Sequence, residues 1–514
     1  MSSVVVGAGA VSIEDVVAVA RHNATITLDP GALAGVAASR AVIDGLASDP
    51  NPHYGISTGF GALATTFIES DRRAQLQASL VRSHAAGSGP EVEREVIRAL
   101  MLLRLSTLMT GRTGVRPVVA ETYAAVINAG ITPVVREYGS LGCSGDLAPL
   151  SHCALATLGE GDVRNAEGVL MPAAEALASA GITPLKLEEK EGLALINGTD
   201  GMLGMLALAI TDLKMLMTTV DISAAMSIEG LMGTDKVFSS DLHALRPQVG
   251  QGQSATNLRN ILADSPIVHS HSGPEDGRVQ DAYSLRCSPQ VHGGARDTIA
   301  HAEMVAGREL ASAVDNPVLT VDGRVESNGN FHGAPVAYVL DFLAIVAADV
   351  ASMSERRTDR FLDRARNQGL PPFLAHEVGV DSGLMIAQYT AAGLVSEMKR
   401  LAVPASADSI PSSAMQEDHV SMGWHAGRKL RKAVDAFSRV VAIELMTAAR
   451  GIDLREPLKP SPVTGAVIAE LRSNGVAGPG ADRFLSPEIE AAAELTLSGR
   501  IAAVAQSAST TPLI

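Results

Sequence analysis

Cysteine is scarce in this 514-residue chain, which holds only Cys143, Cys153 and Cys287. No two of them form a Cys-x-x-Cys pair, and any pairing would leave one cysteine over. A disulfide framework of the kind found in small secreted proteins is therefore excluded. A reducing, cytoplasmic compartment is the simplest expectation.

Aromatic residues and net positive charge are lacking as well. Aromatics make up 3 % of the chain, with a single Trp, and the small and aliphatic residues that dominate favour helix over sheet. Lys and Arg number 41 against 56 Asp and Glu, a net charge of −15. This charge argues against nucleic acid or an anionic membrane surface as a partner.

Long hydrophobic runs and targeting signals are not evident either. The longest apolar run, residues 201–211, stops at Asp212 and is too short to span a bilayer. The N-terminus carries Glu14 and Asp15 and no early basic cluster, so a signal peptide is not expected. An apolar content of 46 % is ample for the core of a globular protein.

The apolar spacing predicts a mainly α protein. We expect a region of residues 1–200 followed by a central helical bundle with a helical tail over 201–514, although one single domain remains possible. Residues 248–296 are rich in Gly, Ser, Gln, Asn, Pro and His and predict a long functional loop. Helices are expected over residues 71–83, 91–109, 202–232, 336–357, 383–401 and 426–449.

The most unusual stretch is residues 139–150, Gly-Ser-Leu-Gly-Cys-Ser-Gly-Asp-Leu-Ala-Pro-Leu. It follows a β-prone segment and opens a helix, with Asp146 as a candidate N-cap and Pro149 in the first turn. A glycine-rich cap on a buried helix would explain part of this pattern. The Gly-x-Ser-x-Gly elbow of a serine nucleophile is absent, because Cys143 follows Gly142.

Self-condensation is another use of such a triplet. The main-chain nitrogen of Gly145 can attack the carbonyl of Cys143, and two dehydrations then leave an imidazolone ring whose methylidene derives from Ser144. This ring is an electrophile that no ordinary side chain provides. It would be 4-methylidene-imidazol-5-one (MIO), and no external cofactor would be needed.

Residues 142–150 resemble the signature of the aromatic amino acid ammonia-lyases, and 54–61, Tyr-Gly-Ile-Ser-Thr-Gly-Phe-Gly, match a second family motif. The family usually has Ala where this chain has Cys143, but the ring uses only the main-chain carbonyl. At least six such motifs extend from Tyr54 to Met422. The resemblance implies an ammonia-lyase/fumarase-like helical fold and a homotetramer whose neighbouring chains share each site.

The resemblance also implies roles for individual residues. Cys143, Ser144 and Gly145 would form MIO, with Asp146 in support. Tyr54 is the favoured catalytic base and Tyr283 its competitor. A base of this kind needs a depressed pKa, which a cation or aligned donors would supply.

Five residues would surround the substrate. Arg286 would bind the substrate carboxylate with its planar fork, and Asn197 and Tyr283 would hydrogen-bond around the carboxylate and the ring carbonyl. Gln280 and Phe331 would line the pocket. On a helical turn, Gln280, Tyr283 and Arg286 would share one face.

Substrate choice rests on His84 and Glu417, which correspond to positions where histidine-specific members place His and Glu. A desolvated carboxylate needs a hydrogen-bonding partner, which an imidazole supplies and a phenyl ring does not. The resemblance therefore implies a carbon-nitrogen lyase that converts L-histidine to trans-urocanate and ammonia. His84 by itself could also be a helix C-terminal charge partner.

Several alternatives remain. Tyrosine or phenylalanine ammonia-lyase, or an aminomutase of the same family, is the strongest. Residues 412–415, Ser-Ser-Ala-Met, resemble a fumarase/aspartase loop, but the rest of that signature is missing. A silent helical scaffold should have lost Ser144 or Tyr54. A metal is not expected, because His269 and His271 have no third ligand at helical spacing.

Overall fold

The computed structural model describes residues 3–63, 65–142, 144–273 and 279–514. It is mainly helical, as predicted. The chain forms two compact units of three segments each, Met1–Leu208, Glu303–Asp341 and Pro404–Arg428 in the first and Ala209–Ala302, Phe342–Val403 and Lys429–Ile514 in the second. The predicted domain division near residue 200 stays a prediction.

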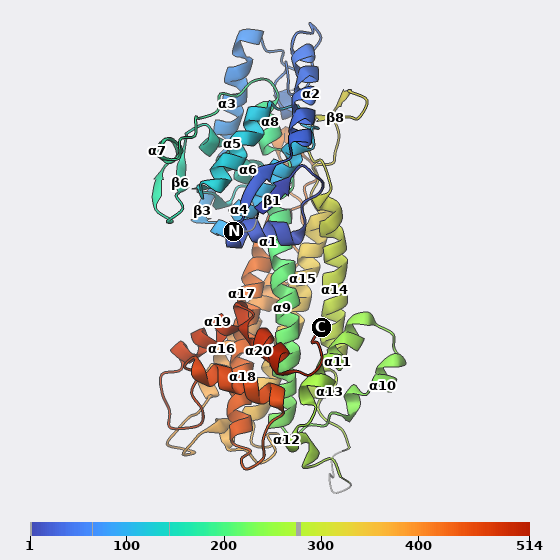
Figure 1. Ribbon diagram of the computed structural model, residues 1–514, viewed down its shortest axis with the longest axis vertical. Coiled ribbons are helices and arrows are strands. Elements are labelled where there is room, and N and C mark those ends of the chain that lie inside the picture. Colours follow the sequence, from blue (N-terminus) through green and yellow to red (C-terminus); the bar gives the residue numbers. More distant parts are fainter. Residues whose placement is uncertain (1–2, 64, 143, 274–278) are drawn as a thin grey trace. The chain divides into compact units, whose positions relative to one another are not determined.

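The first unit combines short helices with small sheets (Figure 1). β1 and β2 pair in parallel, β3 pairs with β5, and β4, β6 and β7 form an antiparallel sheet. Its elements are β1 (Ser3–Val6), α1 (Ile13–His22), β2 (Thr25–Leu28), α2 (Pro30–Ala47), α3 (Arg73–His84), β3 (Ser88–Glu91), α4 (Arg94–Met109), α5 (Pro117–Asn128), β4 (Thr132–Pro133), β5 (Arg136–Tyr138), α6 (Leu147–Thr157), β6 (Asp162–Arg164), β7 (Leu170–Pro172), α7 (Ala173–Ser179), α8 (Glu191–Ile196), β8 (Val318–Leu319) and β9 (Val325–Glu326).

Helix α4 is the core of the first unit. Thirteen of its sixteen residues are buried, and it packs against α1 and α5 (Figure 1). Helix α1 begins with a capping box, in which Ser12 Oγ accepts from Asp15 N and the Asp15 carboxylate accepts from Ser12 N. This cap satisfies two amides that would otherwise lack partners.

The second unit is helical. Its complete helices are α10 (Ser240–Ala244), α11 (Val249–Leu262), α12 (Pro266–His269), α13 (Tyr283–Arg286), α16 (Met385–Leu401), α18 (Pro462–Ser473), α19 (Ser486–Leu497) and α20 (Arg500–Ala508). Four long helices contribute residues to both units: α9 (Asp200–Gly230), α14 (Ser288–Leu310), α15 (Ala334–Leu362) and α17 (Gly423–Asp453).

A buried ion pair lies among the helices of the second unit. Arg357 Nε lies 2.5 Å from Glu444 Oε1, and both side chains are fully buried. The hydroxyls of Ser223, Ser227 and Ser354 also donate to the Glu444 carboxylate. Because these donors satisfy the carboxylate, its pKa stays lowered despite burial.

The predicted long loop over 248–296 is wrong for the described part of this range. It contains α11, α12, α13 and the start of α14. The polar residues that suggested a loop are buried with partners: Gln251 Nε2 contacts His243 Nδ1 at 2.9 Å, and Asn257 Nδ2 donates to Asp221 Oδ2 at 2.9 Å. Polar side chains paired in this way can occupy a buried helix face, so a polar composition does not by itself indicate a loop.

Two helices, α9 and α15, are long and apolar enough to cross a membrane by length and composition. The sequence analysis ended the first apolar run at Asp212, whereas α9 continues through it, with Asp212 paired to Arg431 at 2.8 Å. Within their most apolar windows, 78 % of α9 and 61 % of α15 are buried inside the protein. Core helices of soluble proteins pass the same test, so this finding carries little weight.

Candidate active site

The loop between β5 and α6 holds Ser144 at its tip. Gly145, which follows, has φ +74° and forms a bridge with Gly198. A Cβ at Gly145 would lie 1.9 Å from the Gly198 carbonyl oxygen, so only glycine fits here. Cys143 lies outside the described residues. The turn thus brings the main chain around Ser144 against residues 197–198.

Asp146 links this loop to helix α9 through its side chain. It occupies the N-cap position of α6, as predicted, but its side chain makes no capping bond. Its Oδ1 accepts from Ser140 Oγ at 2.9 Å, and its Oδ2 accepts from Met202 N at 2.8 Å, in the first turn of α9. Burial raises the Asp146 pKa to about 7, and these hydrogen bonds oppose the shift.

A second segment fixes the loop from another side. Ser421 Oγ donates to Gly142 O at 2.9 Å, and Met422 N donates to Leu141 O at 2.9 Å. Two residues after Met422, the buried Trp424 donates its Nε1–H to Glu137 O at 2.7 Å. The loop therefore has backbone anchors on both sides of Ser144.

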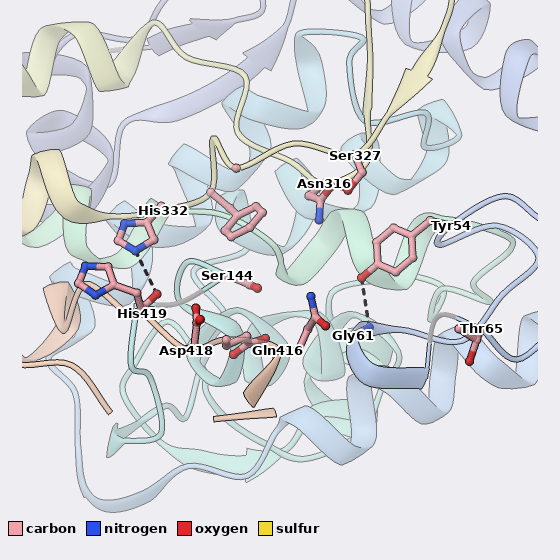
Figure 2. Close-up of a pocket in the computed structure, with 13 residues that line it drawn as sticks. Tyr54, Gly61, Thr65, Ser144, Asn316, Ser327, His332, Gln416, Asp418 and His419 are labelled. Atoms are coloured by element: carbon pink, nitrogen blue, oxygen red, sulfur yellow. Dashed lines mark hydrogen bonds between the residues drawn. The ribbon is translucent and has the colours of Figure 1, made fainter. Parts of the chain in front are cut away.

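Two adjoining cavities open at Ser144. One of about 430 Å³ contains Tyr54, His84, Ser144, Asn197 and Glu417 among its lining residues. The other, of about 660 Å³, shares Tyr54, Ser144 and Glu417 and adds Phe331. Figure 2 shows Ser144 between Tyr54 on one side and His332 on the other. Six residues predicted for the site thus line connected space in the first unit.

Tyr54 receives one hydrogen bond in this cavity. Its hydroxyl accepts from Gly61 N at 3.2 Å (Figure 2). Burial raises the Tyr54 pKa, the Gly61 bond opposes this, and the negative charges of Glu417 and Asp315 add to the rise. The described chain therefore shifts Tyr54 away from the depressed pKa that a base requires.

His84 and Glu417 come to the smaller cavity from distant parts of the chain. His84 is the last residue of α3, and its Nδ1 lies 3.0 Å from Ser83 Oγ. Burial lowers the His84 pKa, and the charge of Glu417 opposes that shift. Glu417 Oε2 accepts from Ser412 Oγ at 3.1 Å. The other carboxylate oxygen, Oε1, accepts no hydrogen bond from the described residues.

Asn197 contributes an amide at the base of the smaller cavity. Its Nδ2 donates to Asn316 O at 3.0 Å, and its main-chain oxygen accepts from Arg104 Nη1 at 2.7 Å. Its Oδ1 is buried and has no hydrogen-bond partner in the described chain. An orphaned buried acceptor in a cavity indicates a donor that comes from a bound group.

The other three predicted residues lie in the second unit and line neither cavity. Gln280 is exposed and precedes α13, so it does not share a helical turn with Tyr283 and Arg286, contrary to the prediction. Tyr283 is 70 % exposed. The Arg286 guanidinium lies 4.7 Å from the centre of the Tyr283 ring, and its Nε donates to Asp281 O.

The comparisons with known proteins agree with this geometry. The family model for aromatic amino acid lyases matches residues 11–473. The chain belongs to this family.

Relatives and solved structures extend the match over the whole chain. A histidine ammonia-lyase of Streptomyces griseus is 64 % identical, with 98 % of this chain and 99 % of that protein covered. The crystal structure of histidine ammonia-lyase from Trypanosoma cruzi has a TM-score of 0.90 at 37 % identity, covering 98 % of this chain and 95 % of that one. Tyrosine aminomutase from Streptomyces globisporus has a TM-score of 0.94 at 35 % identity, with both chains fully covered.

The structure adds residues to the lyase site that sequence reasoning missed. Asn316 lines both cavities, and His332 and His419 stack with ring centroids 5.6 Å apart beside the larger one (Figure 2). A buried pair, Lys190 Nζ and Asp315 Oδ2 at 2.5 Å, lies close enough for the charge of Asp315 to act on the Tyr54 pKa. No local sequence signal marks Lys190 or Asp315.

Proposed function

We propose that this lyase deaminates L-histidine without oxidation, producing trans-urocanate and ammonia. The observation that carries the proposal is the presence of His84 and Glu417 in one cavity with Tyr54, Ser144 and Asn197. The name of the Streptomyces griseus relative, histidine ammonia-lyase, at 64 % identity over the whole chain supports it. As the first step of histidine degradation, the reaction would take place in the cytoplasm, the compartment that the few cysteines favour.

The imidazole of the substrate would bind between His84 and Glu417. Glu417 lines the cavity, and its Oε2 accepts from Ser412 while its Oε1 has no donor among the described residues, so Oε1 can accept an imidazole N–H. The lowered pKa of His84 keeps this ring neutral near pH 7, when it can donate or accept one hydrogen bond. A phenyl ring cannot donate a hydrogen bond to Glu417. Its binding would therefore leave the carboxylate removed from water and without a partner, which is unfavourable.

The residues present fit MIO as a built-in prosthetic group formed by Cys143, Ser144 and Gly145. The turn at Gly145 admits no side chain, which suits a ring closed through its main-chain nitrogen. Asp146 and Asn197 would hold the group. When formed, it supplies an electrophile that no ordinary side chain provides.

The remaining work falls to side chains of the chain itself. Arg286 would bind the substrate carboxylate through its two parallel N–H groups, and Phe331 and Gln280 would line the pocket. Tyr54 would take the β-proton at its hydroxyl oxygen, with Tyr283 as the alternative base. The raised pKa of Tyr54 in the described chain means that a cation from elsewhere would have to lower it.

A homotetramer with shared sites would supply that cation. Gln280, Tyr283 and Arg286 line neither cavity, and Tyr283 is largely exposed. Co-expression of two inactive variants, Ser144→Ala and Arg286→Gln, tests this arrangement. Shared sites predict that mixed oligomers recover activity, whereas inactivity of purified mixed oligomers would contradict sharing. Light scattering on the purified protein would measure the number of chains.

An aminomutase or a tyrosine ammonia-lyase is the second candidate. The TM-score of 0.94 to tyrosine aminomutase favours it, and His84 could pair with a tyrosine hydroxyl as well as with imidazole. Ultraviolet absorbance with histidine, tyrosine and phenylalanine supplied separately distinguishes the products. Urocanate from histidine supports our proposal, whereas coumarate, cinnamate or a β-amino acid as the main product would replace it.

The matched variants Glu417→Gln and Glu167→Gln test the role of the carboxylate. Both remove one negative charge by the same change, but Glu417 lines the two cavities at Ser144, whereas Glu167 is exposed and lines neither. Loss of a charged hydrogen bond of about 2–3 kcal/mol predicts a decrease of about 30- to 150-fold in kcat/KM for histidine with Glu417→Gln. Glu167→Gln should stay near the parent activity. Equal losses in the two variants would refute imidazole recognition by Glu417.

A further inference from the structure

A third cavity of about 280 Å³ lies at the start of helix α4 in the first unit. It shares no lining residue with the two cavities at Ser144. Its charged lining residues are Arg94 and Arg98, and its polar ones are Asn23, Thr25 and Asn128. No carboxylate lines it.

Arg98 is 2 % exposed and has hydrogen bonds on only part of its guanidinium. Its Nε donates to Val19 O and its Nη1 to Ile127 O, each at 3.0 Å. These acceptors are main-chain carbonyls of α1 and α5, which carry partial charges only. Its Nη2 donates to no described residue, but it is not among the fully buried side-chain atoms that lack a partner, and it belongs to a side chain that lines the cavity. This N–H is therefore available to water or a ligand in the cavity.

Arg94 likewise has no carboxylate partner among the described residues. Its Nη2 donates to Asn23 Oδ1 at 2.8 Å, a neutral acceptor. The acidic residues on either side of it pair elsewhere: Glu93 with Arg428, and Glu95 with Arg21 at 2.6 Å. No ion pair joins Arg94 or Arg98 to any described residue, in contrast to the carboxylate-paired arginines 21, 40, 104, 116, 164 and 428 of the same unit.

The position of the two arginines on the helix adds to their charge. Arg94 and Arg98 are four residues apart and begin α4, where the helix dipole is already positive. Burial, together with the charge of Arg94, lowers the Arg98 pKa to about 10. Two like charges at this end of a helix destabilise it unless an anion offsets them. The overall charge of −15 makes such a positive cavity unusual in this chain.

We propose that this cavity binds a small oxyanion, the phosphate or carboxylate group of a small metabolite. Arg98 Nη2 and the free N–H groups of Arg94 would donate to its oxygens, and charge-assisted bonds from guanidinium are the stronger kind. The volume is just below the range of pockets that hold drug-sized ligands, so it suits a small molecule. The proposal is independent of the reaction at Ser144.

Calorimetric titration of the full-length protein with sodium phosphate, and separately with sodium acetate, tests the site at low ionic strength held constant with chloride. The test variant is Arg94→Gln. The control is Arg112→Gln, which removes the same charge from an arginine that lines none of the three cavities and pairs with no described carboxylate. Arg94→Lys retains the charge without the fork and serves as a second test variant.

We expect saturable binding of at least one of the two anions, weakened at least tenfold by Arg94→Gln and unchanged by Arg112→Gln. The bound anion should raise Tm with concentration, because only the folded protein has the site. Arg94→Lys should bind with intermediate affinity. Phosphate binding alone identifies a phosphate ligand, and acetate binding alone a carboxylate. Absence of saturable binding in the parent protein, or equal binding by the parent and Arg94→Gln, would overturn the proposal.

Discussion

Gly145 provides the sharpest test of how the loop is built. Replacement by Ala forces a side chain into the left-handed region, since φ is +74°, at a cost of about 1–2 kcal/mol. The added Cβ would also lie 1.9 Å from Gly198 O, which must recede by about 1.5 Å to reach the 3.4 Å of ordinary contact. Overpacking of this kind costs a further 1–3 kcal/mol or so, hence about 2–5 kcal/mol in all.

Gly168 is the matched control for this substitution. It lies in the turn between β6 and β7 with φ +80°, and a Cβ there would meet nothing within 4 Å. Gly168→Ala should therefore lower the free energy of unfolding by the cost of backbone strain alone, about 1–2 kcal/mol. The difference between the two variants isolates the contact with Gly198.

Chemical denaturation and intact mass would measure the two consequences. We expect the denaturation midpoint of Gly145→Ala to lie below that of Gly168→Ala. In the parent chain and in Gly168→Ala, cyclisation should lower the mass by two waters, whereas Gly145→Ala should retain the full encoded mass and show no turnover. If both alanine variants proved equally stable and equally active, the close approach to Gly198 would not constrain the loop.

Two further predictions concern buried charges. Lys190→Met leaves the buried Asp315 carboxylate without its cation and should lower the free energy of unfolding by about 3–5 kcal/mol. The control Lys459→Met removes an exposed lysine and should change the free energy of unfolding little. Similar denaturation midpoints for the two variants would contradict this prediction. Burial lowers the pKa of His292 below its ordinary value of 6.5, with the Asp221 carboxylate opposing the shift, so below about pH 6.5 the unfolded state binds a proton that the folded state does not. Stability, measured as the denaturation midpoint, should therefore decrease as the pH falls from about 7.5 to about 5.5. The variant His292→Gln should show a weaker dependence of the midpoint on pH. If the midpoint of this variant depends on pH as strongly as that of the parent protein, His292 is not the source of the dependence.

Local sequence patterns predicted the parts of the site that depend on backbone chemistry. A run of glycines around Ser144 requires a tight turn wherever it occurs, because few other residues adopt positive φ. The helix start near residue 147 was likewise recognisable, since capping depends on neighbours within four residues. By contrast, Asp146 was predicted to cap α6, and its carboxylate instead bonds Met202 N, 56 positions away.

Prediction failed where partners are distant along the chain. The polar residues of α11 were taken for a loop because their acceptors, such as Asp221 for Asn257, come from another helix. Gln280 was assigned to the helical turn of Tyr283 because a spacing of three residues fits a helix, but the turn begins only at Tyr283. Spacing indicates which residues could share a face, and it does not determine where the helix begins.

The sequence by itself determined the family, the mainly helical fold and the identity of the chemical groups, since these follow from motif residues and apolar spacing. Only the tertiary structure decided which groups meet. It brought His84, Ser144 and Glu417 to one cavity, left Arg286 outside it, and put Asp315 close enough to raise the Tyr54 pKa. It also paired Glu93 and Glu95 with other arginines, so that the neighbouring Arg94 and Arg98 have no carboxylate partner among the described residues. The physical reason is that burial and pairing depend on distances in space, which local sequence does not specify.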